Sequence, residues 1–113
     1  MTIRELMNRN LFEVRCEGAE PDREISCVFC CDLLSIAMSR GIENAAWVTV
    51  MGNLNTVAVM KLTEMSLIVL AEGVSMDAAG LQKAQEEGCT VLSTDLPVFD
   101  AALLIHRALH GET

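Results

Sequence analysis

Three short segments of the chain contain residue types that could bind a ligand. They are Gly52-Asn53, Ala71-Glu72-Gly73 and Ser93-Thr94-Asp95, and each lies between an apolar run and a segment of helical character. If the apolar runs are parallel strands, the three segments lie beyond strand carboxyl ends, where open sheets of this kind bind ligands. The candidate ligand-binding residues are therefore Gly52, Asn53, Glu72, Gly73, Thr94 and Asp95.

The chemistry of these segments narrows the kind of ligand. Each segment precedes an expected helix N-terminus, whose free amide donors suit an anion or a nucleotide phosphate. Two carboxylates, those of Glu72 and Asp95, oppose an unaccompanied anion, so a bridging metal ion or a neutral ligand fits better. The alternative is structural: Ser75, Thr94 and Asp95 cap helices, and the glycines form turns.

A second candidate centre is the segment Cys27-Val28-Phe29-Cys30-Cys31. A CxxC pair can bind zinc or cycle as a dithiol. On a strand, however, Cys27 and Cys30 point to opposite faces, and the chain has no second CxxC or CxxH. We therefore predict no metal site, and Cys27, Cys30 and Cys31 remain weak candidates for thiol or metal chemistry. The alternative is that these thiols fill space in a sheet.

His106 and His110 are four residues apart, so they share one face of the expected last helix. This is the spacing of a two-histidine metal clasp, but a usable site needs a third ligand, and none lies nearby in sequence. We expect a polar pair at a helix C-terminus, where positive charge is favourable.

Common catalytic signatures are missing from the sequence. It contains no GxxxxGKS or GxxxxGKT phosphate loop, no GxGxxG fingerprint, no GxSxG elbow and no HExxH pair. The sequence therefore predicts neither an enzyme nor a bound cofactor.

The elements that position these residues alternate along the chain. Strands are expected at residues 11–16, 25–31, 45–51, 67–70 and 90–93. A short helix begins at a Thr2–Glu5 capping box, and further helices are expected at residues 33–40, 54–64, 76–87 and 97–110. The predicted helix caps are Asp32, Ser75 and the Thr94-Asp95 pair, and Gly41 and Gly88 are the predicted stops. Repeated strand–helix units favour an α/β class, a three-layer α/β/α domain over residues 1–113 with a mostly parallel sheet of about five strands.

Composition limits the class of partner. The 113 residues are 51% apolar and only 4% aromatic, and their formal charge of −8 opposes binding to nucleic-acid backbones and anionic membranes. The first ten residues lack the apolar stretch of a secretory signal, and no apolar run is long enough to cross a bilayer, so we expect a cytoplasmic protein with reduced thiols.

Most of the chain, from Thr2 to Ile105, resembles a DRTGG domain. The similar segments are DLLSIAM at 32–38, WVTVMGN at 47–53, SLIVLAEG at 66–73 and AQEEGCTVLSTDLPVFDAA at 84–102. Of the residues that name the family, Gly52 and Gly73 are kept. Asn53-Leu54 stands in place of Asp-Arg, and Ala71-Glu72 in place of Thr-Gly. The resemblance implies a fold like the amino-terminal domain of HPr kinase without its kinase domain, regulatory use beside other enzymes, and homodimer contacts. It does not support a serine kinase activity, because the phosphate loop is missing.

Three functional hypotheses follow. The first is a non-catalytic regulatory or protein-interaction module, a homodimer that acts on a regulated enzyme or signalling protein, because a domain this small and apolar is expected to bury a further surface. The second is a sensor that binds a nucleotide or metal at the strand ends. The third is a thiol redox or metal-binding protein that uses Cys27, Cys30 and Cys31.

Overall fold

The structure, a computed structural model, describes residues 1–111. Within that range the chain forms five helices and five strands that largely alternate. In chain order they are α1 (Ile3–Asn8), β1 (Glu13–Cys16), β2 (Val28–Cys30), α2 (Leu34–Arg40), β3 (Ala46–Thr49), α3 (Leu54–Thr63), β4 (Leu67–Leu70), α4 (Ala78–Glu87), β5 (Thr90–Ser93) and α5 (Val98–Leu109).

The strands form one mixed sheet in the order β1-β5-β4-β3-β2. Strands β2, β3, β4 and β5 are parallel to one another, whereas β1 pairs antiparallel with β5. The α/β class is therefore confirmed. Thr49 pairs with Leu70 and Leu70 with Ser93, so the carboxyl ends of β3, β4 and β5 meet at one edge of the sheet.

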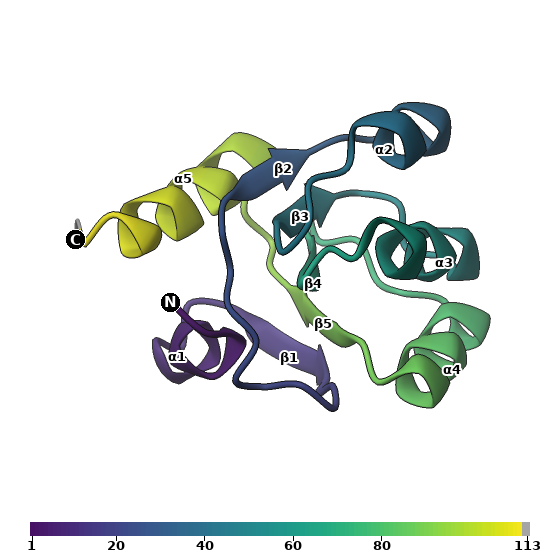
Figure 1. The fold of residues 1–113 in the computed structure, drawn as a ribbon, viewed down its shortest axis with the longest axis horizontal. Helices are drawn as coiled ribbons and strands as arrows, with labels where there is room; N and C mark the ends of the chain where they lie inside the picture. The colour runs from purple at the N-terminus through teal and green to yellow at the C-terminus, as the bar shows by residue number, and fades with distance from the viewer. Residues whose placement is uncertain (112–113) are drawn as a thin grey trace.

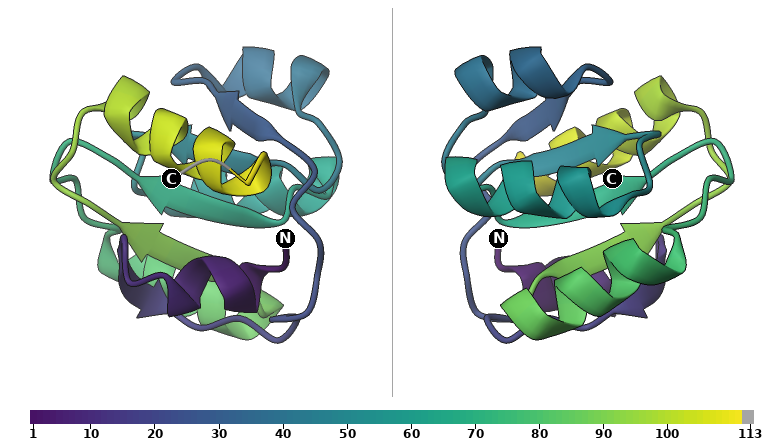
Figure 2. Two further views of the ribbon diagram at one scale, coloured as in Figure 1. Left: turned by 90° about the vertical axis from the view of Figure 1, so that its left-hand side faces the viewer. Right: turned by 90° about the vertical axis from the view of Figure 1, so that its right-hand side faces the viewer.

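Helices cover both faces of this sheet. Helices α2, α3 and α4 lie on one side, and α1 and α5 lie on the other (Figures 1 and 2). Side chains alternate along a strand, so each central strand contributes to two apolar clusters, one beneath each set of helices. Trp47 is fully buried in the cluster beneath α2, α3 and α4, and its indole Nε1 donates to the Cys31 carbonyl at 3.0 Å. Within residues 1–111, every helix is too short or too polar to span a bilayer.

Strand β2 differs from the buried strand that the apolar segment 25–31 predicts. Only three residues pair, and they are half-buried or exposed, because β2 forms the edge of the sheet beyond β3. An apolar run looks the same in a central strand and in an edge strand, which is paired on one side only, so local sequence could not distinguish the two.

The prediction that Asp32 caps the helix after β2 is also wrong. Helix α2 begins after Leu33 without a side-chain cap. The Asp32 carboxylate instead accepts from the Thr49 hydroxyl at 2.8 Å and from the Val50 amide at 3.0 Å, and so joins the end of β2 to the end of β3.

The predicted starts of the last two helices need correction as well. Helix α4 is capped by Asp77, whose carboxylate accepts from the Gly80 amide at 2.7 Å, and not by Ser75. Before α5, the Thr94 hydroxyl accepts from the Leu96 amide in a local turn. The first helical amide, that of Val98, donates to the Glu72 carboxylate at 2.9 Å, a cap from a distant loop.

Other local predictions are confirmed. Thr2 and Glu5 form the predicted capping box of α1. Gly88 ends α4 in the left-handed conformation (φ 68°), which a glycine adopts without steric cost.

Candidate functional site

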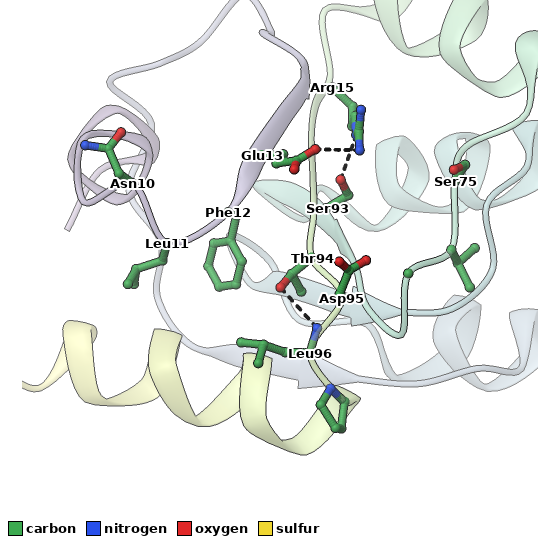
Figure 3. Close-up of a pocket in the computed structure, with 13 residues that line it drawn as sticks. Asn10, Leu11, Phe12, Glu13, Arg15, Ser75, Ser93, Thr94, Asp95 and Leu96 are labelled. Atoms are coloured by element: carbon green, nitrogen blue, oxygen red, sulfur yellow. Dashed lines mark hydrogen bonds and ion pairs between the residues drawn. The ribbon is translucent and has the colours of Figure 1, made fainter.

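A pocket of about 480 Å³ lies at the carboxyl end of β5 (Figure 3). Three segments line it: residues 10–13 with Arg15, residues 73–75 after β4, and residues 93–97 after β5. This volume is within the usual range for small-molecule sites.

The two loops that follow β4 and β5 hold each other in place. The amides of Glu72 and Gly73 donate to the carbonyls of Leu96 and Thr94 at 2.8 and 3.0 Å. Glu72 and Gly73 both have positive φ angles (60° and 74°), which turn the chain sharply back toward the second loop. A Cβ at Gly73 would lie 3.2 Å from the Asp95 carboxylate, so the glycine lets that carboxylate lie close to the loop.

A β-bulge in β1 places a cation at the pocket. The pairing of β1 with β5 shifts between Val14 and Cys16, so Arg15 is the extra residue of the bulge. Bulges change the direction of side chains and are frequent beside functional sites. The Arg15 guanidinium donates through Nε to the Ser93 hydroxyl at 2.7 Å and forms a 2.6 Å ion pair with Glu13 (Figure 3).

The structure brings together some of the six predicted ligand-binding residues. Gly73, Thr94 and Asp95 line the pocket, and Glu72 lies next to it but turns toward α5. Gly52 and Asn53 do not line it. The side chain of Asn53 accepts from two amides of α3.

Gly52 has a packing role outside the pocket. A Cβ at this position would clash with the Ser75 carbonyl oxygen, so only a glycine allows the two loops to lie this close. The amide of Asp77 donates to the Gly52 carbonyl at 3.0 Å, which joins the loop after β3 to the loop before α4.

The helix N-termini near the strand ends are occupied by side chains of the chain itself. Asn53 caps α3, Asp77 caps α4 and Glu72 caps α5. They accept from two first-turn amides of α3, one of α4 and one of α5, which are donors that could otherwise bind a phosphate. The helix N-termini expected from the sequence to bind an anion are therefore partly occupied at α3, α4 and α5.

The charged side chains that line the pocket carry a net negative charge. Arg15 is paired with Glu13, whereas the exposed Asp95 carboxylate makes no hydrogen bond or ion pair with any of residues 1–111. The same range contains no group of three or more His, Cys, Asp or Glu side chains placed to hold a metal ion. The predicted bridging metal therefore lacks a ligand set among these residues.

The cysteines do not form a combined centre. All five are free and lie in the described range. Cys27 and Cys31 pack against the cluster beneath α2, α3 and α4, while Cys30 is exposed. Although the residue is exposed, partial desolvation by the atoms around its thiol, with a smaller contribution from the Asp32 charge, raises the pKa of Cys30, so the thiol is less ionised at neutral pH than an ordinary cysteine.

Sequence reasoning missed Glu13 and Arg15. Both lie in the strand predicted at residues 11–16, but their place at the pocket depends on the antiparallel pairing with β5 and on the bulge. Arg15 and Ser93 are 78 residues apart, so no local spacing could have indicated their contact.

Comparison with known proteins gives no family assignment. No protein-family model matches the chain, and no curated protein matches it.

Proposed function

We propose that this chain is a non-catalytic regulatory or protein-interaction module, a DRTGG-like three-layer α/β/α domain that acts as a homodimer. The observation that supports the proposal best is the unprotected edge of the sheet at β2. No catalytic step is assigned to the chain, and its partner would be a regulated enzyme or signalling protein.

Edge strands usually contain features that prevent pairing with another chain, such as lysines or prolines. The segment that includes β2 and α2, residues 25–42, has neither, and Asp32 and Arg40 are its only charged residues. The charge of Asp32 is already engaged with Thr49 and Val50. Neither a free charge nor a proline therefore prevents the backbone of β2 from pairing with a further strand over its three residues.

Apolar side chains lie exposed on α2 and on the residues that flank it, beside this edge. Leu33 is 55% exposed, and Ile36, Met38 and Ile42 are each more than two-fifths exposed. On the other face of the sheet, α5 packs against β2, and Phe99 in its first turn is 70% exposed. Because β2 pairs over only three residues, these helices would supply most of the buried area in a dimer.

Charge favours a second copy of the chain as the occupant of this edge. Each copy has a net charge of −8, so most faces repel one another. The segment 25–42 has one acid and one base and is formally neutral. Antiparallel pairing of β2 with its own copy is two-fold symmetric and closes the assembly, as in most homodimers.

Sedimentation velocity over a range of concentrations tests the proposal. The wild-type chain is expected to be dimeric at micromolar concentration, and Cys30→Lys and Ile36→Lys are expected to shift it to monomer, because each places a charge against its own copy. Val14→Lys is the matched control, since Val14 is 47% exposed on β1, the opposite edge. A monomeric wild-type chain, or a dimer that only Val14→Lys disrupts, would contradict the proposal.

A second function, small-ligand sensing, is supported by the pocket that brings together Gly73, Thr94 and Asp95. A ligand at one hundred times its Kd raises the free energy of unfolding by about 2.7 kcal/mol. Thermal-shift measurements with nucleotides, divalent cations and small organic probes test this function. The absence of any shift across the panel would count against it.

A further inference from the structure

We infer that the pocket at the carboxyl end of β5 binds a small organic cation, a primary amine attached to an apolar body. The inference rests on the second proposed function, ligand binding in this pocket, and is independent of the homodimer. It follows from the charge left over in the pocket, from the first amide of α5, which Glu72 already occupies, and from the apolar part of the lining.

The unpaired charge in the pocket is negative. Glu13 and Arg15 neutralise each other at 2.6 Å, and Arg15 also donates to Ser93. The Asp95 carboxylate is left without a partner among residues 1–111, and it lies close to Gly73. An ammonium group beside Asp95 would form a charge-assisted hydrogen bond. The net charge of −8 adds a general attraction for cations.

An anion is a poorer fit for the same pocket. A carboxylate or phosphate would approach Asp95 without a net positive charge to compensate, because the Arg15 charge is already balanced by Glu13. The N-terminus of α5 beside the pocket offers no open first amide, since the Val98 amide donates to Glu72. Both observations favour a positively charged group.

A metal ion is a poorer fit than an amine. Mg²⁺ and Ca²⁺ need several oxygen ligands, usually including more than one carboxylate. No group of three His, Cys, Asp or Glu side chains in residues 1–111 is arranged for this. An ammonium group needs fewer acceptors, and the carboxylate of Asp95, which lines the pocket, offers two oxygens.

The apolar part of the lining accommodates the body of the ligand. Leu11, Phe12 and Leu96 lie on the side of the pocket nearest α1 and α5, whereas Ser75 and Arg15 lie on the other side of β5 (Figure 3). The pocket therefore has an apolar half and a polar half, and the acid stands between them. An amine with a single aromatic ring matches this division and the volume of about 480 Å³.

Amide chemical-shift titration of the full chain tests the inference with two probes that share an aromatic ring and differ in charge, phenethylammonium and phenylacetate. We expect phenethylammonium to bind with a Kd of about 1 mM or below and to shift the amides of residues 73–75 and 93–96. Phenylacetate is expected to bind at least about tenfold more weakly.

Two variants connect the result to the acid. Asp95→Asn keeps the size and removes the charge, so phenethylammonium affinity is expected to fall about tenfold. Asp100→Asn, in the first turn of α5 and outside the pocket lining, is the matched control and is expected to leave the affinity unchanged.

The possible failures are distinguishable. Equal or tighter binding of phenylacetate at these residues, or unchanged affinity in Asp95→Asn, would overturn the amine assignment while leaving a ligand pocket. No shift of these amides with either probe, together with no thermal shift across the nucleotide and metal panel, would overturn the ligand site itself.

Discussion

Asp32 is expected to stabilise the sheet, and its removal gives a sharp test of the structure. Its carboxylate accepts from the fully buried Thr49 hydroxyl at 2.8 Å and from the Val50 amide at 3.0 Å. Asp32→Ala leaves both donors without this acceptor at the carboxyl end of β3. If Asp32 were a helix cap instead, the same change would affect the start of α2 and leave Thr49 undisturbed.

The expected loss can be worked out from the two bonds. A hydrogen bond to a charged group contributes about 1.5–3 kcal/mol, and Asp32 is an exposed residue, so each bond belongs at or below the lower limit. Asp32→Ala should therefore lower the free energy of unfolding by about 2–3 kcal/mol. In a domain of this size that corresponds to a fall in Tm of roughly 10 °C.

Urea unfolding followed by circular dichroism measures this loss. Asp32→Asn is the conservative control, because its amide oxygen still accepts from both donors, and it should lose less than half as much. In a Thr49→Val background the Asp32→Ala change should cost less than in wild type, because one donor is already missing. A loss below about 0.5 kcal/mol, the usual size for a surface substitution, would refute the role assigned to Asp32.

Two further predictions concern stability. Glu72→Ala removes the cap on the Val98 amide of α5 and should cost about 1 kcal/mol in urea unfolding, whereas Glu72→Gln keeps an acceptor and should cost less; equal stability of the two variants would argue against the cap. Burial raises the pKa of the Cys89 thiol from its ordinary value of 9.0 to about 11. The unfolded chain loses this proton first, so stability should be complete below pH 9 and fall by roughly 2–3 kcal/mol between pH 9 and 11. Cys89→Ala should lack this fall, and an equal fall in that variant would assign it to other groups.

The central strands could be predicted because their patterns are local. Residues 67–70 and 90–93 are uniformly buried strands, as the apolar runs between turn residues predict. The same pattern was misleading at residues 25–31, which are equally apolar but lie at the edge of the sheet. A strand's place in the sheet depends on pairing with other strands, and a strand's own residues do not specify it.

The candidate site could be predicted only in part, for a related reason. Gly73, Thr94 and Asp95 were found because they follow parallel strands, and parallel strands bring their carboxyl ends together. Glu72 was found as well, but its carboxylate is committed to capping α5, 26 residues away. The acceptor for a helix amide is set by the nearest suitable oxygen in space, which sequence proximity does not identify.

The sequence by itself determined the α/β class, the central strands, the capping box of α1 and the glycine stop of α4. Each of these depends on propensities and hydrogen bonds between residues that are close along the chain. Only the tertiary structure decided that β1 runs antiparallel to β5, that a bulge turns Arg15 toward Ser93, and that β2 is an open edge. Those features come from contacts between residues tens of positions apart, whose energies depend on how the layers pack and leave no periodic signal in the sequence.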